Sequence, residues 1–233
     1  MNLNILHFDT LDSTNAYLKR KQGSLEDFSF VVASYQTAGK GREKRKWMAN
    51  HGENLLFSIL IKDPALLTKG PRLSSIAAAG VASFLEKEVG LKGIAYKWPN
   101  DVYVSGKKIC GILLEGSLPT YLAIGVGVNV NQTVFEGDYR VPPTSVALEK
   151  EKTIDLQEFA DTLFPYLASY LKETSEEEVL RYLQAKDFLF GKEVKLPIAI
   201  GIAAGIGEDF SLLVEDEGDG VCRVLVGEAS LVH

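Results

Sequence analysis

Short apolar runs follow one another closely between residues 94 and 131, and this succession constrains the fold more than any other feature of the sequence. Each run has the length and the Val, Ile or aromatic content that is typical of a β-strand. The expected strands are residues 94–96, 102–104, 108–115, 121–124 and 125–131. Ser105-Gly106, followed by Lys107, is typical of a tight hairpin turn. Because few long helices separate these strands, they predict a mostly antiparallel sheet.

Further strands and helices are expected on both sides of this region. Strands are predicted at residues 4–8, 30–33 and 55–61. Asp12-Ser13-Thr14-Asn15 consists of residues that cap helix N-termini, and it predicts a helix that ends near Gly23. Apolar residues at helical spacing predict further helices at residues 72–88, 156–171 and 175–188.

The C-terminal part has a different pattern. Short strands separated by Gly and acidic turns are predicted at residues 194–196, 198–202, 211–214, 221–226 and 229–232, which favours a small β-barrel. The fold class is therefore α+β, with a mixed, mostly antiparallel sheet, helices packed on one face, and a small C-terminal barrel. The expected domains are residues 1–187 and 188–233.

Composition narrows the possible functions. The net charge of −6 and the pI of about 5.2 argue against general nucleic-acid binding. Cys110 and Cys222 are far apart, which suggests neither a disulfide framework nor a zinc site. The N-terminus lacks a signal-peptide pattern, and the longest uncharged run, residues 196–207, is too short to span a bilayer. A cytoplasmic protein without membrane contact is expected.

Residues 36–47, QTAGKGREKRKW, are a local exception to the acidic composition. This loop carries five cations, Lys40, Arg42, Lys44, Arg45 and Lys46. Like charges this close repel one another. One interpretation is a solvated, mobile loop; the other is an anion-binding loop that stays open until a ligand supplies the negative charge.

Three other segments are candidates for chemistry. The Asp12–Asn15 segment either only caps its helix or also binds a polar ligand beside the free N–H groups of the helix. The Lys97-Trp98-Pro99-Asn100-Asp101 segment is either a rigid turn, because Pro99 restricts the backbone, or a site where Asp101 holds Mg²⁺. Lys108 is either a surface lysine or the partner of a bound anion, with Gly111 giving a ligand access to the backbone.

Several common sites are missing from the sequence. Gly125-x-Gly127 lacks the third glycine of the dinucleotide fingerprint, and no phosphate-binding P-loop is present. Cys110 has no nearby base, and the three histidines have no metal-ligand spacing. Asn129 and Asn131 share a face of a strand and are candidates for ligand or metal contact. A cationic loop, a strand lysine and a turn carboxylate without a nucleophile suit a reaction that joins two anions, where neutralisation and positioning lower the barrier.

These segments, in this order, resemble the biotin–protein ligases. The matching residues are Asp12–Asn15, the loop 36–47, Lys97–Asp101, Lys108-x-x-Gly111, Gly125–Asn131 and the closing Gly227-Glu228-Ala229-Ser230-Leu231. The resemblance covers essentially the whole chain. It implies a mixed sheet with helices and an SH3-like C-terminal barrel, which agrees with the fold expected from the strand pattern.

The resemblance also implies roles for individual residues. It implies biotin contacts from Ser13, Thr14, Asn15, Gln36, Lys40, Gly41, Arg42, Lys108 and Gly111. It implies ATP contacts from Arg42, Arg45, Lys46, Trp47, Asn100 and Asn131, with Trp47 stacked on adenine. Lys108 and Arg42 are the implied catalytic residues, and Asp101 is the implied Mg²⁺ ligand. Lys40 and Lys44 replace an arginine and a glycine of the family pattern.

The implied reaction has two steps. Biotin and ATP give biotinyl-5′-AMP and pyrophosphate, and biotin then passes to a lysine of a biotin carboxyl carrier protein, as in a biotin–[acetyl-CoA-carboxylase] ligase. The loop 36–47 would also act as a lid, because the mixed anhydride must be kept from water. A form without the DNA-binding domain of some members is expected, so no DNA partner is, and the protein would be a monomer or homodimer.

Two alternatives remain open. A lipoate or octanoate ligase or transferase of the same fold is disfavoured by the Lys40–Trp47 and Lys97–Asp101 clusters. A non-catalytic module that binds nucleic acid through the basic loop is disfavoured by the acidic pI and by the lack of interleaved aromatic residues.

Overall fold

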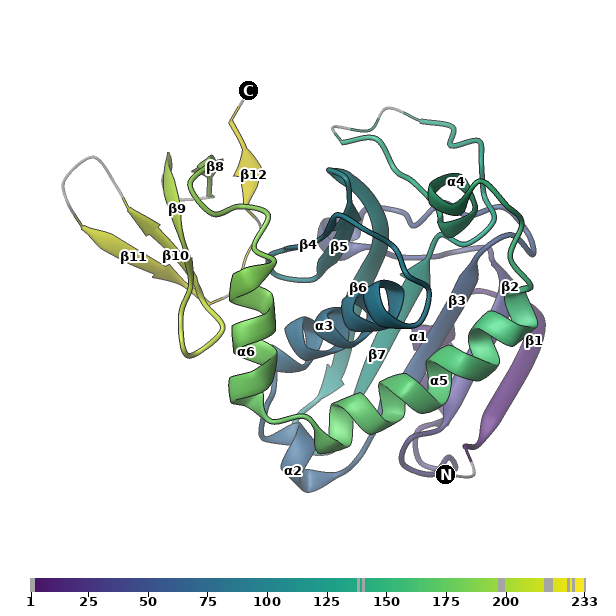
Figure 1. Ribbon diagram of the computed structural model, residues 1–233. Coiled ribbons are helices and arrows are strands. Elements are labelled where there is room, and N and C mark those ends of the chain that lie inside the picture. Colours follow the sequence, from purple (N-terminus) through teal and green to yellow (C-terminus); the bar gives the residue numbers. More distant parts are fainter. Residues whose placement is uncertain are drawn as a thin grey trace.

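A seven-stranded sheet forms the centre of the computed structural model, which describes residues 3–137, 139, 141–196, 200–215, 220–225, 227 and 229–232 (Figure 1). The strand order is β1-β2-β3-β7-β6-β5-β4. β1 runs parallel to β2, and the other neighbouring pairs are antiparallel. The strands are β1 (Ile5–Leu11), β2 (Phe30–Gln36), β3 (Leu55–Ile61), β4 (Ile94–Lys97), β5 (Asp101–Val104), β6 (Lys107–Ser117) and β7 (Tyr121–Val128). The predicted mixed, mostly antiparallel sheet is confirmed.

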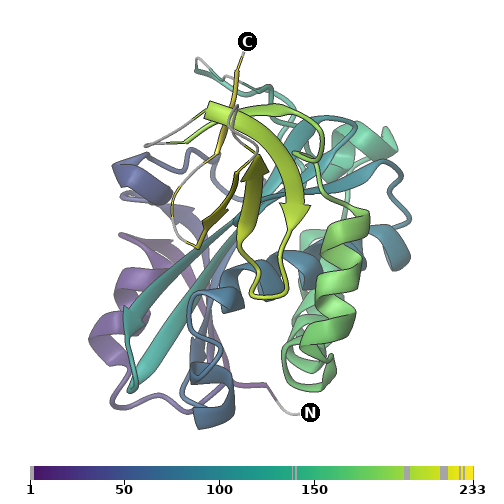
Figure 2. The same cartoon turned by 90° about the vertical axis from the view of Figure 1, so that its left-hand side faces the viewer.

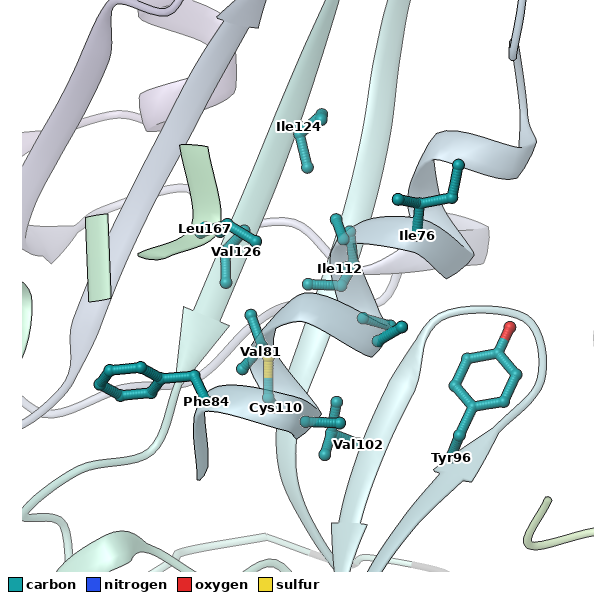
Figure 3. Close-up of a cluster of buried hydrophobic side chains, with 14 of the residues drawn as sticks. Ile76, Val81, Phe84, Tyr96, Val102, Cys110, Ile112, Ile124, Val126 and Leu167 are labelled. Carbon is teal, nitrogen blue, oxygen red and sulfur yellow. The ribbon is translucent and has the colours of Figure 1, made fainter. Parts of the chain in front are cut away.

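Two long helices cover one face of this sheet. α3 (Arg72–Lys87) and α5 (Leu156–Glu173) pack against each other and bury nearly all of their apolar residues. Figure 3 shows side chains of α3, among them Val81 and Phe84, gathered with Val126 of β7 and Leu167 of α5. α5 begins at the Asp155 cap, whose carboxylate accepts the backbone N–H groups of Gln157 and Glu158, as expected for a helix N-terminus. This apolar layer is the main core.

The opposite face carries a helix as well, so the prediction of helices on one face was wrong. α1 (Thr14–Lys21) buries Leu18 in a second cluster with Val31, Leu60 and Ala123. The reason lies in β3, whose seven residues are all buried. A strand that is apolar without alternation is covered on both faces.

Several elements differ from the predicted bounds. β1 and β2 extend further than expected, to Leu11 and Gln36, while residues 121–128 form a single strand, β7, that ends before Asn129. Two short helices were not predicted, α2 (Pro64–Leu67) and α4 (Val146–Lys150). Both have clear caps, Asp63 before a proline at the first turn and Ser145, but neither is long enough to show helical periodicity. A short 3-10 turn, η1 (Arg42–Lys44), lies in the cationic loop.

A second, five-stranded antiparallel sheet follows α6 (Glu176–Ala185), with the order β11-β10-β9-β8-β12. Its strands are β8 (Glu193–Lys195), β9 (Ile200–Ile206), β10 (Leu212–Glu215), β11 (Val221–Val224) and β12 (Ser230–Leu231). This sheet agrees with the predicted SH3-like C-terminal part. Ile198, Ala199, Val226 and Glu228, which the predicted strands and closing motif include, lie outside the described residues.

The two sheets contact each other through the Lys97–Asp101 segment and α6. The indole N–H of Trp98 donates to the carbonyl of Phe210 at 3.0 Å, and the Gln184 amide donates to the carbonyl of Ile206 at 2.7 Å. Figure 2 shows the strands of the second sheet in front of the large sheet and its helices. The division at residues 187 and 188 stays a prediction. Within the part of the chain that the structure describes, no helix is long and apolar enough to cross a bilayer.

Candidate active site

A cavity of about 610 Å³ lies between the N-terminus of α1, the end of β2, and the middle of β6 and β7. The cavity lies on the face of the sheet that α1 covers. Alternate residues of a strand point to the same face, so Gly125 and Gly127 lie on the same face as Ala123, which packs in the cluster with Leu18 of α1. The loop 40–48 and the Lys97–Asp101 segment complete its wall, together with Ser230 and Leu231 of the second sheet. Its volume is in the range typical of small-molecule sites.

One side of the cavity is a buried polar pocket at the start of α1. Ser13 caps the helix by accepting the N–H of Ala16 at 3.4 Å, and Ser13, Thr14 and Asn15 are all buried. The backbone N–H of Thr14 donates to Oε1 of Gln36 at 2.8 Å, which joins β2 to the helix. The four residues predicted to bind a polar ligand therefore lie together. The capping role and the lining role do not exclude each other, since Ser13 has both.

Two residues that the sequence did not single out organise this pocket. The hydroxyl oxygen of Ser58, on β3, lies 2.7 Å from both Thr14 Oγ1 and Asn15 Oδ1. The amide of Asn15 donates to the carboxylate of Glu115 at 2.9 Å. Burial alone would raise the pKa of Glu115, but hydrogen bonds from Asn15 and Lys19 outweigh it and hold the pKa below its usual value. The pocket is thus satisfied internally and fixed in shape.

Glycines form the floor of the cavity. A Cβ placed on Gly125 would lie 2.8 Å from the Asn15 amide, and one on Gly127 would lie 2.5 Å from the indole of Trp47. A Cβ on Gly111 would lie 2.8 Å from the same indole and 3.2 Å from Nζ of Lys108. The distances to the Asn15 amide and to the Trp47 indole are shorter than real Cβ contacts, and the distance to Lys108 would require this side chain to shift. The absence of side chains at these three positions therefore creates the space that Asn15, Trp47 and Lys108 share.

The cationic loop forms the other side of the cavity. Lys40, Arg42, Arg45 and Lys46 all line it, as does Gly41. A backbone bridge between Lys40 and Lys46 closes the loop at its base, and Glu43 holds a left-handed conformation with φ of 52°. The guanidinium of Arg42 donates to Oδ1 of Asn100 at 3.4 Å and to the carbonyl of Gly227. The side chain of Lys44 lies outside the described residues.

Trp47 rests on the glycine floor with its indole N–H buried and without a hydrogen-bond partner among the described residues. Lys108 lies beside it, with Nζ 5.5 Å from the ring centroid and 2.8 Å from Oδ1 of Asp101. The Lys108 side chain is 30% exposed and lines the cavity. This position favours the anion-partner interpretation of Lys108 over the surface-lysine interpretation.

Asn131, a candidate for ligand contact, lies away from the cavity. The side-chain amide of Asn131 donates to the carbonyl of Ile154 and accepts the N–H of the same residue, at 2.8 Å each. Asn131 does not line the cavity. Asn129, which was predicted to share a strand face with Asn131, does line the cavity, and its side-chain amide donates to the carbonyl of Thr144 at 3.0 Å. Cys110 is buried in the main core, and this burial raises the pKa of its thiol well above its ordinary value, as expected for an inert thiol.

Two carboxylates among the described residues line the cavity, Asp101 and Glu43, and Glu43 lies 3.6 Å from the guanidinium of Arg45. Over the described ranges no group of three His, Cys, Asp or Glu side chains is placed to hold a metal ion. Additional cavity-lining residues that the sequence gave no reason to select come from the segment before α4, namely Phe135, Tyr139, Val141 and Pro143. Their only signal is the length of the connection, since long loops beside a sheet edge often carry function.

Known proteins are similar to this chain in sequence and in fold. The model of the biotin/lipoate A/B protein ligase family matches residues 7–129. A bifunctional ligase/repressor, BirA, of Salmonella typhimurium is 32% identical over 230 residues, which cover 92% of this chain and 70% of that protein. A biotin–[acetyl-CoA-carboxylase] ligase of Paracoccus denitrificans is 35% identical over 167 residues, 68% of this chain and 69% of that protein.

The fold comparison agrees with the sequence comparison. The biotin protein ligase of Aquifex aeolicus, solved in complex with biotin and ATP, superposes with a TM-score of 0.85 at 29% identity and covers 98% of each chain. Taken with the matched family model and the relatives above, this likeness leads to one conclusion: the chain belongs to the biotin/lipoate A/B protein ligase family.

Proposed function

We propose that the chain is a biotin–protein ligase, which activates biotin with ATP and transfers it to a lysine of a carrier protein. The observation that carries this proposal is that one cavity joins a neutral polar pocket to a cationic loop, with Lys108 beside its glycine floor. A neutral pocket suits the urea group of biotin, and cations suit its carboxylate and the phosphates of ATP. The names of the relatives, which are biotin ligases, support the same substrates.

The polar pocket would bind the fused rings of biotin. Ser13, Thr14, Asn15 and Gln36 offer hydroxyl and amide groups that can accept and donate hydrogen bonds to a urea. Ser58 and Glu115 fix the positions of Thr14 and Asn15, and Thr14 in turn bonds to Gln36, so little entropy is lost when a ligand binds. Gly111 borders the route of the acyl chain towards Lys108.

The first step would join two anions. A carboxylate oxygen of biotin attacks the α-phosphorus of ATP, an O–P bond forms, and the bond to pyrophosphate breaks. Lys108 would hold the carboxylate, while Arg42, Arg45 and Lys46 offset the phosphate charge and Lys40 and Gly41 line the path. Two like charges in contact cost about 4 kcal/mol at an effective dielectric of about 20, so these cations stabilise the approach. Trp47 and Asn100 would border the nucleotide.

The carboxylate of Asp101 fits a Mg²⁺ ion that arrives with the nucleotide. Mg²⁺ commonly binds one or two carboxylates and takes its other ligands from phosphates and water. Asp101 would hold the ion together with the ATP phosphates, and the ion would neutralise phosphate charge. Asp101 already pairs with Lys108 at 2.8 Å, so it lies close to the place where both charges are needed.

The second step would transfer the biotinyl group. The amine of the acceptor lysine attacks the carbonyl carbon of biotinyl-AMP, a C–N bond forms, the C–O bond to phosphate breaks, and AMP leaves as the amine loses a proton. The loop 40–47 would exclude water until the acceptor arrives. The acceptor is proposed to be a biotin carboxyl carrier protein, and the enzyme a cytoplasmic monomer or homodimer that needs no DNA.

Biotin-dependent exchange of pyrophosphate into ATP tests the proposal directly. Purified protein should incorporate labelled pyrophosphate into ATP when biotin and Mg²⁺ are present and not when biotin is omitted. Lipoate and octanoate, tested in parallel, should give no exchange. Exchange with lipoate in place of biotin would assign the chain to the other branch of its family, and exchange with none of the three acids would overturn the ligase proposal.

A further inference from the structure

Four residues connected by hydrogen bonds lie at and behind the polar pocket, and we call them the pocket network. Glu115 accepts the side-chain amide of Asn15 at 2.9 Å, and the hydroxyl oxygen of Ser58 lies 2.7 Å from both Asn15 Oδ1 and Thr14 Oγ1. Thr14 and Asn15 line the active-site cavity, whereas Ser58 and Glu115 do not. The pocket network thus connects a carboxylate outside the cavity to the wall that a ligand would touch.

Ser58 is placed where packing alone would not call for a polar residue. It is the one polar residue of β3, it is fully buried, and it lies directly opposite Gly125 of β7. A Cβ on Gly125 would lie 2.8 Å from Asn15 Oδ1, so the missing side chain gives the Asn15 amide its place beside the hydroxyl. A buried hydroxyl costs free energy unless it is hydrogen-bonded. The contacts of Ser58 therefore have to be accounted for.

The orientation of the Asn15 amide is fixed by two groups that can only accept. Its nitrogen donates to the carboxylate of Glu115 at 2.9 Å and to the carbonyl of Leu113 at 3.2 Å. Burial alone would raise the pKa of Glu115, but the bonds from Asn15 and Lys19 hold it below its usual value, so the carboxyl is ionised at neutral pH. An ionised carboxylate has no hydrogen to donate. Oδ1 of Asn15 must therefore face Ser58.

The direction set at Asn15 continues to Thr14. Oδ1 of Asn15 can only accept, so the single hydrogen of the Ser58 hydroxyl is used on it. Two hydroxyl oxygens 2.7 Å apart need a hydrogen between them, so Thr14 donates to Ser58, and not to Oε1 of Gln36 at 3.2 Å. Thr14 Oγ1 is left with lone pairs that can accept a hydrogen bond from a ligand.

Gln36 supplies the opposite group. Its Oε1 accepts the backbone N–H of Thr14 at 2.8 Å, so its NH₂ is the end that remains to donate. Both residues line the cavity, which therefore offers an acceptor and a donor from adjacent residues. This pair matches a cyclic urea, whose N–H groups donate and whose carbonyl oxygen accepts. The dithiolane ring of lipoate has neither group.

We propose that Glu115 and Ser58 are positioning residues that set the direction of the hydrogen bonds in the pocket and so select a urea. They act through Asn15 and Thr14 and do not touch the substrate. With the opposite direction, the hydroxyl of Thr14 would point its hydrogen at the N–H groups of the urea, and donor would face donor. The inference rests on the proposed function, since it concerns how the pocket recognises biotin.

Glu115→Gln tests the direction without changing the shape of the side chain. The ammonium of Lys19, 3.0 Å from the carboxylate, should attract the oxygen of the new amide and turn its NH₂ towards Asn15. We expect the dissociation constant for biotin, measured by calorimetry without ATP, to rise about tenfold, because a hydrogen bond in the pocket is lost. In pyrophosphate exchange the KM for biotin should rise by the same factor, while kcat and the KM for ATP stay within about twofold.

A second substitution should repair the first. Without the cation at Lys19, the amide oxygen introduced by Glu115→Gln is free to turn towards Asn15. Lys19→Met combined with Glu115→Gln should therefore bring the dissociation constant back to within about threefold of the original. Lys19→Met alone should raise it by less than about threefold, because a partly exposed ion pair contributes little. If Glu115 only maintains shape or stability, the two losses should add instead.

Ser58→Ala tests the middle of the pocket network. It leaves Asn15 Oδ1 without its donor and frees the hydrogen of Thr14, so the dissociation constant for biotin should rise about tenfold. Ser29→Ala is the matched control, because Ser29 is also fully buried and accepts the amide of Asn4 at 3.0 Å without lining the cavity. The control should keep the original affinity for biotin. Thermal unfolding shows whether each variant has kept its fold.

The outcomes separate this inference from the proposed function. Unchanged biotin affinity in folded Glu115→Gln or Ser58→Ala would overturn the positioning role, and so would a loss that Lys19→Met deepens. In both cases, biotin-dependent exchange by the original protein upholds the ligase proposal. An original protein that neither binds biotin nor catalyses the exchange would overturn both.

Discussion

The two halves of the active-site cavity are built in opposite ways. The polar pocket around Ser13, Thr14 and Asn15 stands on a helix and on strands β2 and β3, and each side chain in it has a partner within the protein. The cationic half stands on a loop that a Lys40–Lys46 bridge closes and that leaves the indole N–H of Trp47 buried without a partner among the described residues. One half is complete before a ligand arrives. The other half carries an excess of positive charge that an anionic ligand would neutralise.

This difference follows from the chemistry of the two ligands. A neutral urea is recognised by the directions of its hydrogen bonds, so its site gains from rigid donors and acceptors. Phosphates are recognised mainly by charge, and charge acts over a wider range of geometries. A rigid cationic site would also hinder the entry of ATP and the exit of AMP, whereas a loop can open and close. The predictions below test whether the two halves differ in this way.

The largest effect is expected at Lys108. Lys108→Gln removes the cation proposed to hold the biotin carboxylate and should lower the rate of biotin-dependent exchange about 10²–10³-fold, as for loss of one electrostatic stabiliser. The neighbouring Lys107→Gln, at an exposed position, is the matched control and should keep the original rate. Exchange kinetics measure both. Equal rates for the two variants would return Lys108 to the role of a surface lysine.

The glycine floor is tested by Gly127→Val. A side chain here would lie in the space that Trp47 now occupies, 2.5 Å from its ring, and should displace both Trp47 and the substrate. Because a misplacement of about 1 Å can cost about 10²-fold in rate, we expect a loss of that size in exchange with a folded protein. Gly23→Ala, with no atom within 4 Å of the added carbon, is the control. A Gly127 variant with full activity would show that the floor is not used.

Limited proteolysis tests the mobility of the cationic half. Arg45 and Lys46 are exposed in the loop and are substrates for trypsin. Biotin and ATP together should slow cleavage there about tenfold, because closure of the loop over the adenylate removes the open form. Cleavage after the exposed Lys152, which does not line the cavity, gives the internal reference. The same rate with and without ligands would mean that the loop does not close.

The smallest effect is expected at Asp12, which stabilises the rigid half. A hydrogen bond from the guanidinium of Arg20 holds the pKa of the Asp12 carboxyl at about 2, below its ordinary 3.8. Since the folded-state pKa is lowered, the stabilisation is present above the ordinary pKa and is lost as the pH falls from about 4 towards 2. Asp12→Asn should therefore lower the Tm by no more than about 2 °C at pH 7, because the pair is exposed, and by nothing near pH 2. Thermal unfolding across this pH range measures the difference in Tm between the original protein and the variant. This difference should not grow as the pH falls.

Much of the fold was predictable because strong local signals agree with the tertiary structure. Residues 30–33 and nearly all of residues 55–61 are apolar, and the helix at residues 72–87 carries apolar residues at helical spacing. Caps such as Ser13 and Asp155 mark helix starts. The cap predicted the helix α1 itself, but its place on the second face was not predicted, because its apolar content is low and Leu18 is its one fully buried apolar residue in that cluster. The short helices α2 and α4 lack the length that periodicity needs.

Site residues were predictable where their type alone points to chemistry. They were not predictable where only a contact made by the fold gives a residue its role. The Asp12–Asn15 segment, the cationic loop and Lys108 have types that stand out, and the structure brings them together. Ser58 resembles any serine in an apolar strand, and Glu115 resembles any surface carboxylate; only their contacts across the sheet make them part of the pocket. Asn131 is the reverse case, because an amide suited to a ligand is used to fix the backbone of Ile154.

The positions of the two tryptophans give this protein a pair of built-in optical reporters. Trp98 is 2% exposed and donates its N–H to a carbonyl of the second sheet, so its emission should follow the contact between the two sheets. Trp47 lies on the cavity floor beside Lys108, so its emission should follow the arrival of biotin and the movement of the loop. Substituting phenylalanine for one or the other separates the signals. Ligand binding and the contact between the sheets can then be timed in the same molecule without any added label.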